Sequence, residues 1–116
     1  EVLISAAKLA ELRIFEDEAG KMDLDATAAG GAFLVVSQFT LAASLARGRR
    51  PSFDRAAPPE QAEPLVALLV SAIRERGLVV AAGRFRAHMA VHLVNDGPVT
   101  FVLDVTPPAP RTMAPA

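Results

Sequence analysis

The run AFLVVSQFTL, at residues 32–41, restricts the possible fold more than any other segment of this sequence. Its four successive apolar residues at 33–36 do not alternate with polar ones, which is typical of a strand buried on both faces of a sheet. The end of the run is polar, with Ser37, Gln38 and Thr40. We therefore predict a buried strand that presents polar groups where it ends.

Two segments have helical periodicity. Residues 5–15 place apolar side chains near helical spacing and offer Ser5 as an N-cap, which predicts a helix that ends near Phe15. Residues 59–76 repeat apolar side chains at i, i+3 and i+4, and Gly77 follows them. The sequence thus predicts two amphipathic helices, one near the start and one in the middle of the chain.

Glycines punctuate the segment between the first helix and the apolar run. Gly20 predicts a turn, and Gly30 and Gly31 close a second connection, at residues 26–31, that is predicted to be a loop. Residues 42–58 form a longer irregular connection, and a loop of that length inside a compact domain tends to be functional or mobile.

Three further strands are predicted after the second helix. They span residues 78–82, 88–94 and 99–105, and the last two alternate with period two. The motif VNDGPVT joins these two as a hairpin, whose turn needs only Asn-Asp-Gly, so Pro98 is surplus to the turn. Periodicity alone allows an α/β or an α+β fold.

Composition limits the size of the domain and its compartment. The chain has 116 residues, of which 52% are apolar, which predicts one compact domain at 1–105 followed by a disordered Pro-rich tail at 106–116. Because we find neither a membrane-spanning apolar run nor the features of a signal peptide, we expect a cytoplasmic protein that does not enter a membrane.

The same composition excludes several kinds of chemistry. The chain has no cysteine, which rules out disulfides, thiolate catalysis and cysteine-ligated zinc. His88 and His92 would lie ~13 Å apart along a strand, too far to share one metal ion, so we expect no metal. We also expect no cofactor. The net charge of −1 is not the overall signature of a nucleic-acid binder, although residues 47–55 concentrate arginine.

Three segments together resemble one protein family. They are LRIFEDEAGKM at 12–22, LVVSQFTL at 34–41 followed by GRRPSF at 48–53, and VNDGPVT at 94–100. Over residues 9–104 the chain resembles the D-aminoacyl-tRNA deacylases, which are homodimers that hydrolyse the ester between a D-amino acid and the 3′ end of tRNA. The resemblance implies an α/β fold with a curved, barrel-like mixed β-sheet and two α-helices.

The resemblance also implies a role for the surplus proline. In the family the Gly-Pro peptide bond is cis, and the dipeptide reaches into the pocket of the partner subunit, where it would select the chirality of the amino acid. Gly97 and Pro98 hold that place in this sequence. The alternative is an ordinary hairpin turn with a trans proline.

By the same resemblance, the SQFT segment forms the other wall of the catalytic pocket. Its members are Ser37, Gln38, Phe39 and Thr40. Since no histidine base accompanies Ser37, we favour direct hydrolysis by water, with donors that stabilise the ester carbonyl and with the ribose 2′-hydroxyl as a further assistant. Thr40 would hold either the amino acid or the water, and the alternative for Ser37 and Thr40 is simple pairing with strand backbone.

Two groups of residues are implied in binding the rest of the substrate. The substrate-binding group is Phe85, Met89 and Asn95, of which Phe85 and Met89 correspond to family positions near the terminal adenosine. The group for tRNA phosphates is Arg47, Arg49 and Arg50. Core packing is the alternative for Met89, and the alternative for the arginines is an inward fold onto acidic partners, with Pro51 and Phe53 as loop anchors.

The sequence departs from the family pattern at several places. The family's N-terminal strands are expected to be missing here, Arg86 stands where the family has a glycine after Phe85, and Asp23 replaces a usual asparagine. Arg86 is the departure expected to disturb the pocket, because glycine permits a close approach of backbone and ligand. Two kinds of function therefore stay open: an active dimeric deacylase, or a chain that has lost catalysis and is either an inactive remnant or an RNA or protein interaction module.

Overall fold

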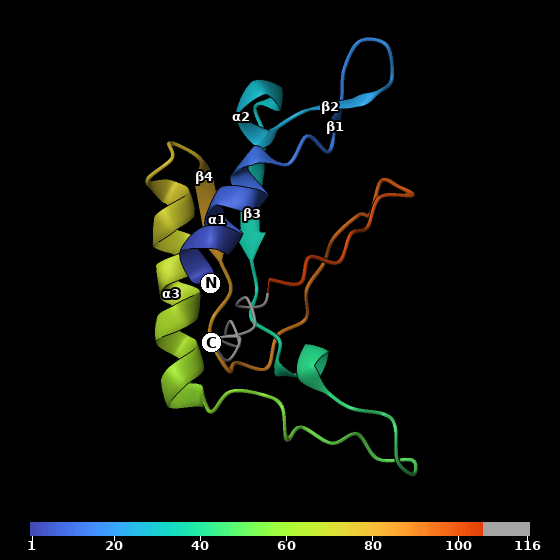
Figure 1. Ribbon diagram of the computed structural model, residues 1–116, viewed down its shortest axis with the longest axis vertical. Helices are drawn as coiled ribbons and strands as arrows, with labels where there is room; N and C mark the ends of the chain where they lie inside the picture. The colour runs from blue at the N-terminus through green and yellow to red at the C-terminus, as the bar shows by residue number, and fades with distance from the viewer. Residues whose placement is uncertain (106–116) are drawn as a thin grey trace, which may run out of the picture.

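The computed structural model of the chain describes residues 1–105 (Figure 1). Its elements in chain order are α1 (Val2–Glu11), β1 (Phe15–Glu16), β2 (Met22–Leu24), α2 (Ala26–Ala29), β3 (Ala32–Val35), the 3₁₀ helix η1 (Phe39–Ala42), α3 (Pro59–Arg74) and β4 (Val79–Ala82). No helix within residues 1–105 combines the length and apolar character needed to cross a membrane. The predicted disorder of the tail at 106–116 lies outside the described residues.

Helix α1 begins and ends earlier than the sequence predicts. It starts at Val2, so Ser5 lies inside it and donates its hydroxyl to the Glu1 carbonyl at 2.9 Å instead of capping the N-terminus. The helix ends where Leu12 adopts an extended conformation (φ −61°, ψ 128°). Phe15, predicted as the end of this helix, belongs to β1.

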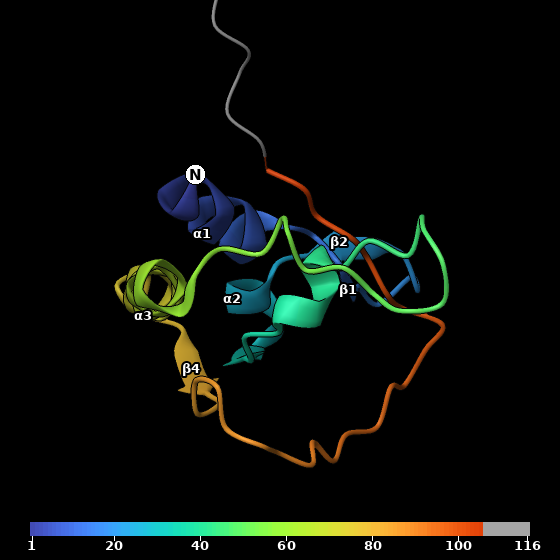
Figure 2. The same ribbon diagram turned by 90° about the horizontal axis from the view of Figure 1, so that it is seen from below.

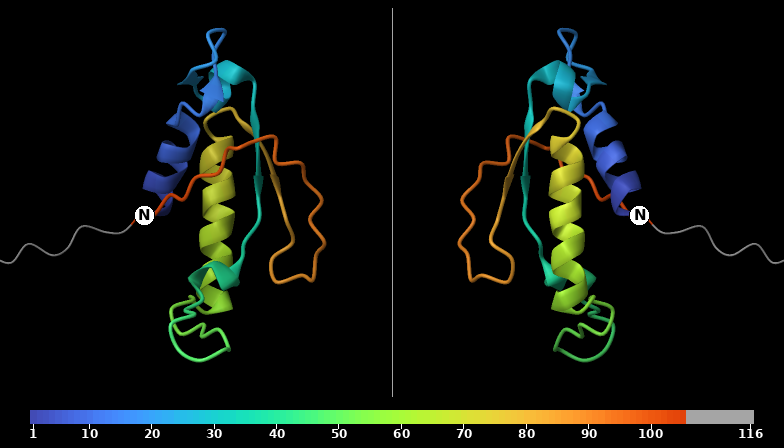
Figure 3. Two further views of the ribbon diagram at one scale, coloured as in Figure 1. Left: turned by 90° about the vertical axis from the view of Figure 1, so that its right-hand side faces the viewer. Right: turned by 90° about the vertical axis from the view of Figure 1, so that its left-hand side faces the viewer.

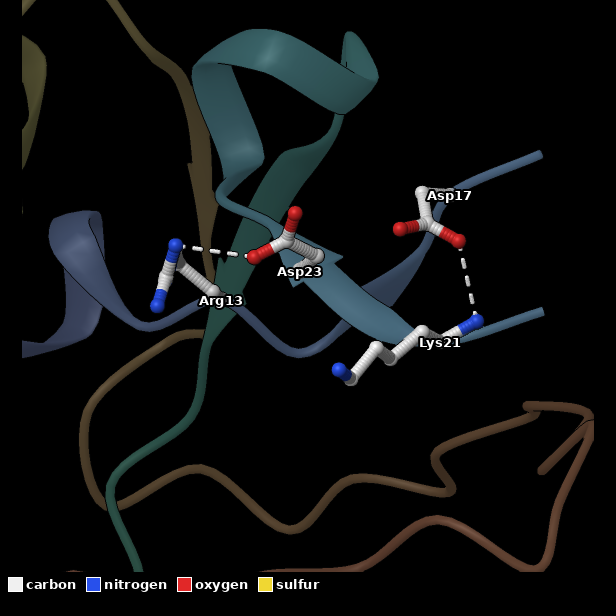
Figure 4. Close-up of polar contacts among 4 residues, drawn as sticks. All are labelled: Arg13, Asp17, Lys21 and Asp23. Carbon is white, nitrogen blue, oxygen red and sulfur yellow. Dashed lines mark hydrogen bonds and ion pairs between the residues drawn. The ribbon is translucent and has the colours of Figure 1, made fainter. Parts of the chain in front are cut away.

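The predicted turn around Gly20 is confirmed, and it joins β1 to β2. Asp17 organises this turn, because its Oδ1 accepts from the backbone N–H groups of Ala19 at 2.9 Å and Lys21 at 3.0 Å. Figure 4 shows the second of these hydrogen bonds. Gly20 adopts a left-handed conformation with φ 77°, which glycine reaches at no steric cost. The two strands pair antiparallel, with Phe15 opposite Leu24.

The predicted loop at 26–31 instead contains the short helix α2. Asp25 caps its start, with Oδ1 accepting from the Ala28 N–H at 2.8 Å, and Gly30 ends it with φ 68°. An aspartate before the helix and a glycine after it are the ordinary start and stop signals, and the sequence interpretation overlooked the first of them.

Strand β3, helix α3 and strand β4 form a β-α-β unit with parallel strands (Figures 1 and 3). Ala32 lies opposite Val79, and the register continues to Val35 opposite Ala82. The predicted second helix is confirmed as α3 at Pro59–Arg74, and the predicted strand at 78–82 is confirmed as β4.

The core lies where α1 and α3 pack against each other and α3 packs on β4 (Figure 2). Ile73 is the one fully buried large side chain among the described residues. The alanines Ala6, Ala10 and Ala72 are buried on the helices, and their small side chains let α1 and α3 approach closely. The whole buried set is Ala6, Ala10, Ala26, Val70, Ala72, Ile73, Leu78 and Val80.

The prediction that β3 is buried on both faces is wrong for the described chain. The strand ends at Val35, and Leu34 is 60% exposed on the face that points away from the helices. β4 covers one edge of β3, and no described element covers its outer face. Continuous apolar sequence therefore marks a strand here without burying both of its faces.

The predicted hairpin at 88–94 and 99–105 is also not formed. Within residues 1–105 these segments hold no strand and share no backbone hydrogen bond, and Val94 and Val102 are 89% and 94% exposed. They make an open excursion instead (orange to red in Figures 1 and 3). Two strands without a covering layer are marginally stable, which accounts for the open arrangement.

The fold class α/β is confirmed, but the barrel-like sheet with two helices is not. The described strands form two separate two-stranded sheets, and three α-helices accompany them. The radius of gyration is 17.3 Å, above the roughly 13 Å of a compact domain of this size, because the excursion and the 43–58 loop extend outward.

Candidate active site

An open cavity of about 860 Å³ lies where β3 ends, next to η1, the start of α3 and the turn after β4. Its described lining is mostly apolar and consists of Val36, Ser37, Gln38, Phe39, Ala42, Ala56, Ala57, Pro58, Pro59, Ala62, Val66, Phe85, Arg86, Ala87, Met89 and Val91. A mostly apolar cavity with few polar groups is typical of a site for a small ligand. The cavity brings together residues from three separate segments of the chain, 36–42, 56–66 and 85–91.

Of the three polar residues that follow β3, Ser37 and Gln38 reach this cavity and Thr40 is not among its lining residues. Ser37 and Gln38 line it, and the side chain of Gln38 donates from Nε2 to Thr40 Oγ1 at 2.7 Å. The Thr40 hydroxyl is therefore bonded to a neighbouring side chain, and not to strand backbone as the alternative interpretation held. Among the described lining residues no histidine or carboxylate accompanies Ser37, so the cavity lacks the base that a serine nucleophile needs.

Phe39 joins the cavity to the long loop that follows it. Its ring meets the ring of Phe53 edge to face, with centroids 4.9 Å apart. Ser44 and Ser52 exchange two backbone hydrogen bonds, at 2.8 and 2.9 Å, which close the intervening loop. The loop is thus held at both its base and its aromatic anchor.

The three predicted phosphate-binding arginines lie in that closed loop. Arg47, Arg49 and Arg50 are exposed, and within residues 1–105 none of them forms an ion pair. The described chain accordingly does not have the inward-folded arrangement on acidic partners that the sequence left open, although Phe53 does anchor the loop.

Phe85 and Met89 line the opposite wall of the cavity. Met89 is 38% exposed and its sulfur accepts from the Arg84 N–H at 3.5 Å, so it lies beside the cavity and not in the core. Both residues share the cavity with Ser37 and Gln38, although about fifty positions separate the two pairs in the sequence.

Asn95, Gly97 and Pro98 do not line this cavity in the described chain. They lie on the open excursion, where the Gly97–Pro98 peptide bond is cis, as the resemblance implies. Asn95 donates from Nδ2 to Thr100 Oγ1 at 3.4 Å, and a Cβ added to Gly97 would come within 2.6 Å of the Val99 nitrogen. The excursion therefore holds these residues apart from the Ser37 wall within one subunit.

Arg86 is the lining residue that sequence reasoning treated only as a disturbance. The sequence already distinguished Arg86, because this arginine stands at a position where a glycine is expected. No three histidine, aspartate or glutamate side chains come together as a metal site within residues 1–105.

Comparison with known proteins identifies the family. A family profile described as D-Tyr-tRNA(Tyr) deacylase matches residues 1–104. The chain belongs to the D-Tyr-tRNA(Tyr) deacylase family. Over 99 residues, covering 85% of the chain, it is 60% identical to the D-aminoacyl-tRNA deacylase of Geobacter sulfurreducens and 61% identical to that of Symbiobacterium thermophilum.

The chain spans 65% and 66% of the lengths of these two deacylase relatives. Among solved structures it is similar to the c-Myc DNA Unwinding Element Binding Protein, with a TM-score of 0.76 and 38% identity over 85% of this chain and 68% of that one. The described elements therefore share the arrangement of that solved structure, even though they do not close a barrel.

Proposed function

We propose that this deacylase-family chain hydrolyses the ester of D-aminoacyl-tRNA and releases the D-amino acid and free tRNA in the cytoplasm. The observation that carries the proposal is the cavity, in which Ser37, Gln38 and Phe39 of the SQFT segment share the lining with Phe85 and Met89. The 58–61% identity to several named D-aminoacyl-tRNA deacylases favours this activity over an inactive remnant. Residues 1–105 act as a single domain in this account.

The cavity volume suits the reacting end of such a substrate. Ligand sites generally measure ~300–1,000 Å³, and about 860 Å³ accommodates an aminoacylated adenosine. Phe85 stacks on the terminal adenine, a contact worth ~1–3 kcal/mol per base, with Met89 beside it and Asn95 contributing from the excursion. The exposed arginines Arg47, Arg49 and Arg50 bind phosphates further along the tRNA.

The SQFT wall orients the ester and stabilises its carbonyl. The first hydrogen bond of η1 runs from the Leu41 N–H to the Gln38 carbonyl at 3.2 Å. The N–H groups of Phe39 and Thr40 come before it in the chain, so this helix does not use them. These two donors and the Gln38 amide group supply hydrogen bonds to the oxygen that becomes negative during attack. Thr40 keeps the Gln38 side chain in place through its 2.7 Å hydrogen bond.

Water is the nucleophile in this mechanism. Its oxygen attacks the ester carbonyl carbon, the bond from that carbon to the ribose 3′-oxygen breaks, and a proton passes to the departing 3′-oxygen, with the neighbouring 2′-hydroxyl as its relay. Ser37 orients the ester or the water without forming an acyl intermediate, since it has no base. No cofactor or metal is required for these steps.

Chirality is selected across a homodimer. Gly97 and Pro98 of one subunit reach the cavity of its partner, where their backbone carbonyls hold the substrate amino group and exclude a side chain of L configuration. This exclusion does not depend on which side chain a D-amino acid carries. Glycine has no side chain to exclude, so glycyl esters are hydrolysed in part.

Subunit mixing tests this function and its shared site together. Gly97→Ala and Gln38→Ala each remove one half of the site, so each variant alone should lose hydrolysis of D-tyrosyl-tRNA. Unfolding the two together and refolding them should restore about a quarter of the wild-type rate, because half of the dimers carry one intact site. No recovery in verified mixed dimers would show that both halves act within one subunit.

A further inference from the structure

Residues 84–87 form a tight turn directly after β4. The Ala87 N–H donates to the Arg84 carbonyl at 3.1 Å, and Arg86, the third residue of the turn, has φ 61°. Phe85 is not among the residues with positive φ, so the turn is of type II, which requires a left-handed third residue and favours glycine there. Arg86 thus occupies a position that an L side chain rarely takes.

Arg86 is also the one non-glycine residue with positive φ among residues 1–105. Asparagine and aspartate tolerate this conformation better than arginine, which gains no local hydrogen bond from it. Residues kept in such a conformation cluster at binding and catalytic sites. Arg86 therefore makes the folded chain less stable than a glycine at the same position would. A functional role would compensate for this loss of stability.

The cavity supplies a candidate role. Arg86 is the one charged residue among the described lining of the 860 Å³ cavity, and the side chains around it, including those of Ser37, Gln38 and Phe85, are uncharged. It is exposed and forms no ion pair within residues 1–105. A guanidinium stays protonated and offers five donors that match an oxyanion such as phosphate.

We propose that Arg86 binds the phosphodiester next to the terminal adenosine of the substrate and so positions the ester at the SQFT wall; this rests on the proposed function. Phe85, one residue before it in the same turn, is the residue assigned to the adenine. A base stacked on Phe85 brings its own 5′-phosphate within the reach of a long neighbouring side chain. The carboxylate of an acidic D-amino acid offers similar chemistry, but the phosphate is present in every substrate.

The test compares Arg86→Gly with Arg86→Lys and with Arg84→Ala as the matched control. Arg84 lies in the same turn but lines the neighbouring cavity of about 580 Å³. The probe is a short single-stranded RNA that carries D-tyrosine at its 3′ end through a non-hydrolysable amide. For Arg86→Gly we expect Kd to rise about tenfold and the slope of log Kd against log salt to fall by about 0.7, the value for one phosphate contact on a single strand.

Thermal unfolding separates this role from a structural one. Arg86→Gly should keep or raise Tm because glycine accepts the left-handed conformation, while Arg86→Lys should keep most of the salt slope and Arg84→Ala should match the wild type. An unchanged Kd and slope in folded Arg86→Gly would overturn the proposal. A loss confined to a D-aspartyl probe would overturn it too, by assigning the guanidinium to the amino-acid carboxylate.

The proposal and the proposed function fail separately. Hydrolysis of D-tyrosyl-tRNA by the wild type, with no effect of Arg86→Gly on binding, removes the role of Arg86 alone. Binding of the amide probe through Arg86, without hydrolysis of the ester, removes the catalytic function alone.

Discussion

The rings of Phe39 and Phe53 meet edge to face, with centroids 4.9 Å apart and planes inclined by 60°. One ring belongs to the 3₁₀ helix η1 beside the cavity and the other to the loop that carries three exposed arginines. The contact thus couples the position of the arginine loop to the wall of the cavity.

Truncation of this anchor should loosen the loop. Phe53→Ala removes an aromatic pair worth ~0.5–1.5 kcal/mol beyond area burial, so we expect the free energy of unfolding to fall by about 1–2 kcal/mol and tRNA binding to weaken. Chemical denaturation and tRNA titration measure the two effects. Leu45→Ala is the control, since Leu45 lies in the same loop but is 77% exposed, and its change should stay within ~0.5 kcal/mol.

The hydrogen bond between Gln38 and Thr40 predicts a specific catalytic defect. Thr40→Val removes the acceptor at 2.7 Å and frees the Gln38 amide, so kcat for D-tyrosyl-tRNA should drop about 10–100-fold, somewhat less than the loss of a direct donor, with KM little changed. Thr40→Ser keeps the hydroxyl and should retain most of the activity. Equal kcat in Thr40→Val and wild type would exclude Thr40 from the site.

The helix contact depends most on Ile73. Its side chain is the one fully buried large side chain among the described residues. We therefore expect Ile73→Ala to lower the free energy of unfolding by about 2–5 kcal/mol and Ile73→Val to lower it by ~0.5–1.5 kcal/mol. Leu68→Ala on the same helix removes a side chain of a residue that is 44% exposed and should cost clearly less. Similar losses for Leu68→Ala and Ile73→Ala, measured by denaturation, would contradict the described core.

The ion pair between Arg13 and Asp23 should contribute little to stability. Its atoms lie 2.8 Å apart, but the two side chains are 69% and 47% exposed (Figure 4). An exposed pair generally contributes ~0.2–1 kcal/mol, so Asp23→Asn, which removes the charge and keeps the shape of the side chain, should change the free energy of unfolding by under about 0.5 kcal/mol. A loss several times larger would mean that this carboxylate has a further partner.

Local signals predicted part of the fold well. The spacing of apolar residues before Gly77 is sufficient to identify α3, because a helix of sixteen residues shows its periodicity several times over. Gly20 likewise predicted its turn, since positive φ demands such a residue. The short helix α2 was missed because four residues show no period, although Asp25 and Gly30 marked its ends.

Tertiary context decided the rest. The alternation at 88–94 and 99–105 describes what these segments favour when they pair within a sheet, and in the described chain neither segment pairs with β3, β4 or the other segment. Only the resemblance suggested that the SQFT segment and Phe85 belong to one pocket. Nothing in the local sequence indicates that Ser37 and Met89 line the same cavity. The turn that places Arg86 left-handed required the structure, since arginine gives no sign of it.

The rate of hydrolysis of D-tyrosyl-tRNA against L-tyrosyl-tRNA by the 116-residue chain tests the central claim most directly. A version extended by any upstream residues that the gene encodes should be measured beside it. We predict hydrolysis of the D-ester and negligible hydrolysis of the L-ester, with Gln38→Ala abolishing the former. Comparable hydrolysis of both esters, or none of the D-ester by either version, would contradict the assignment.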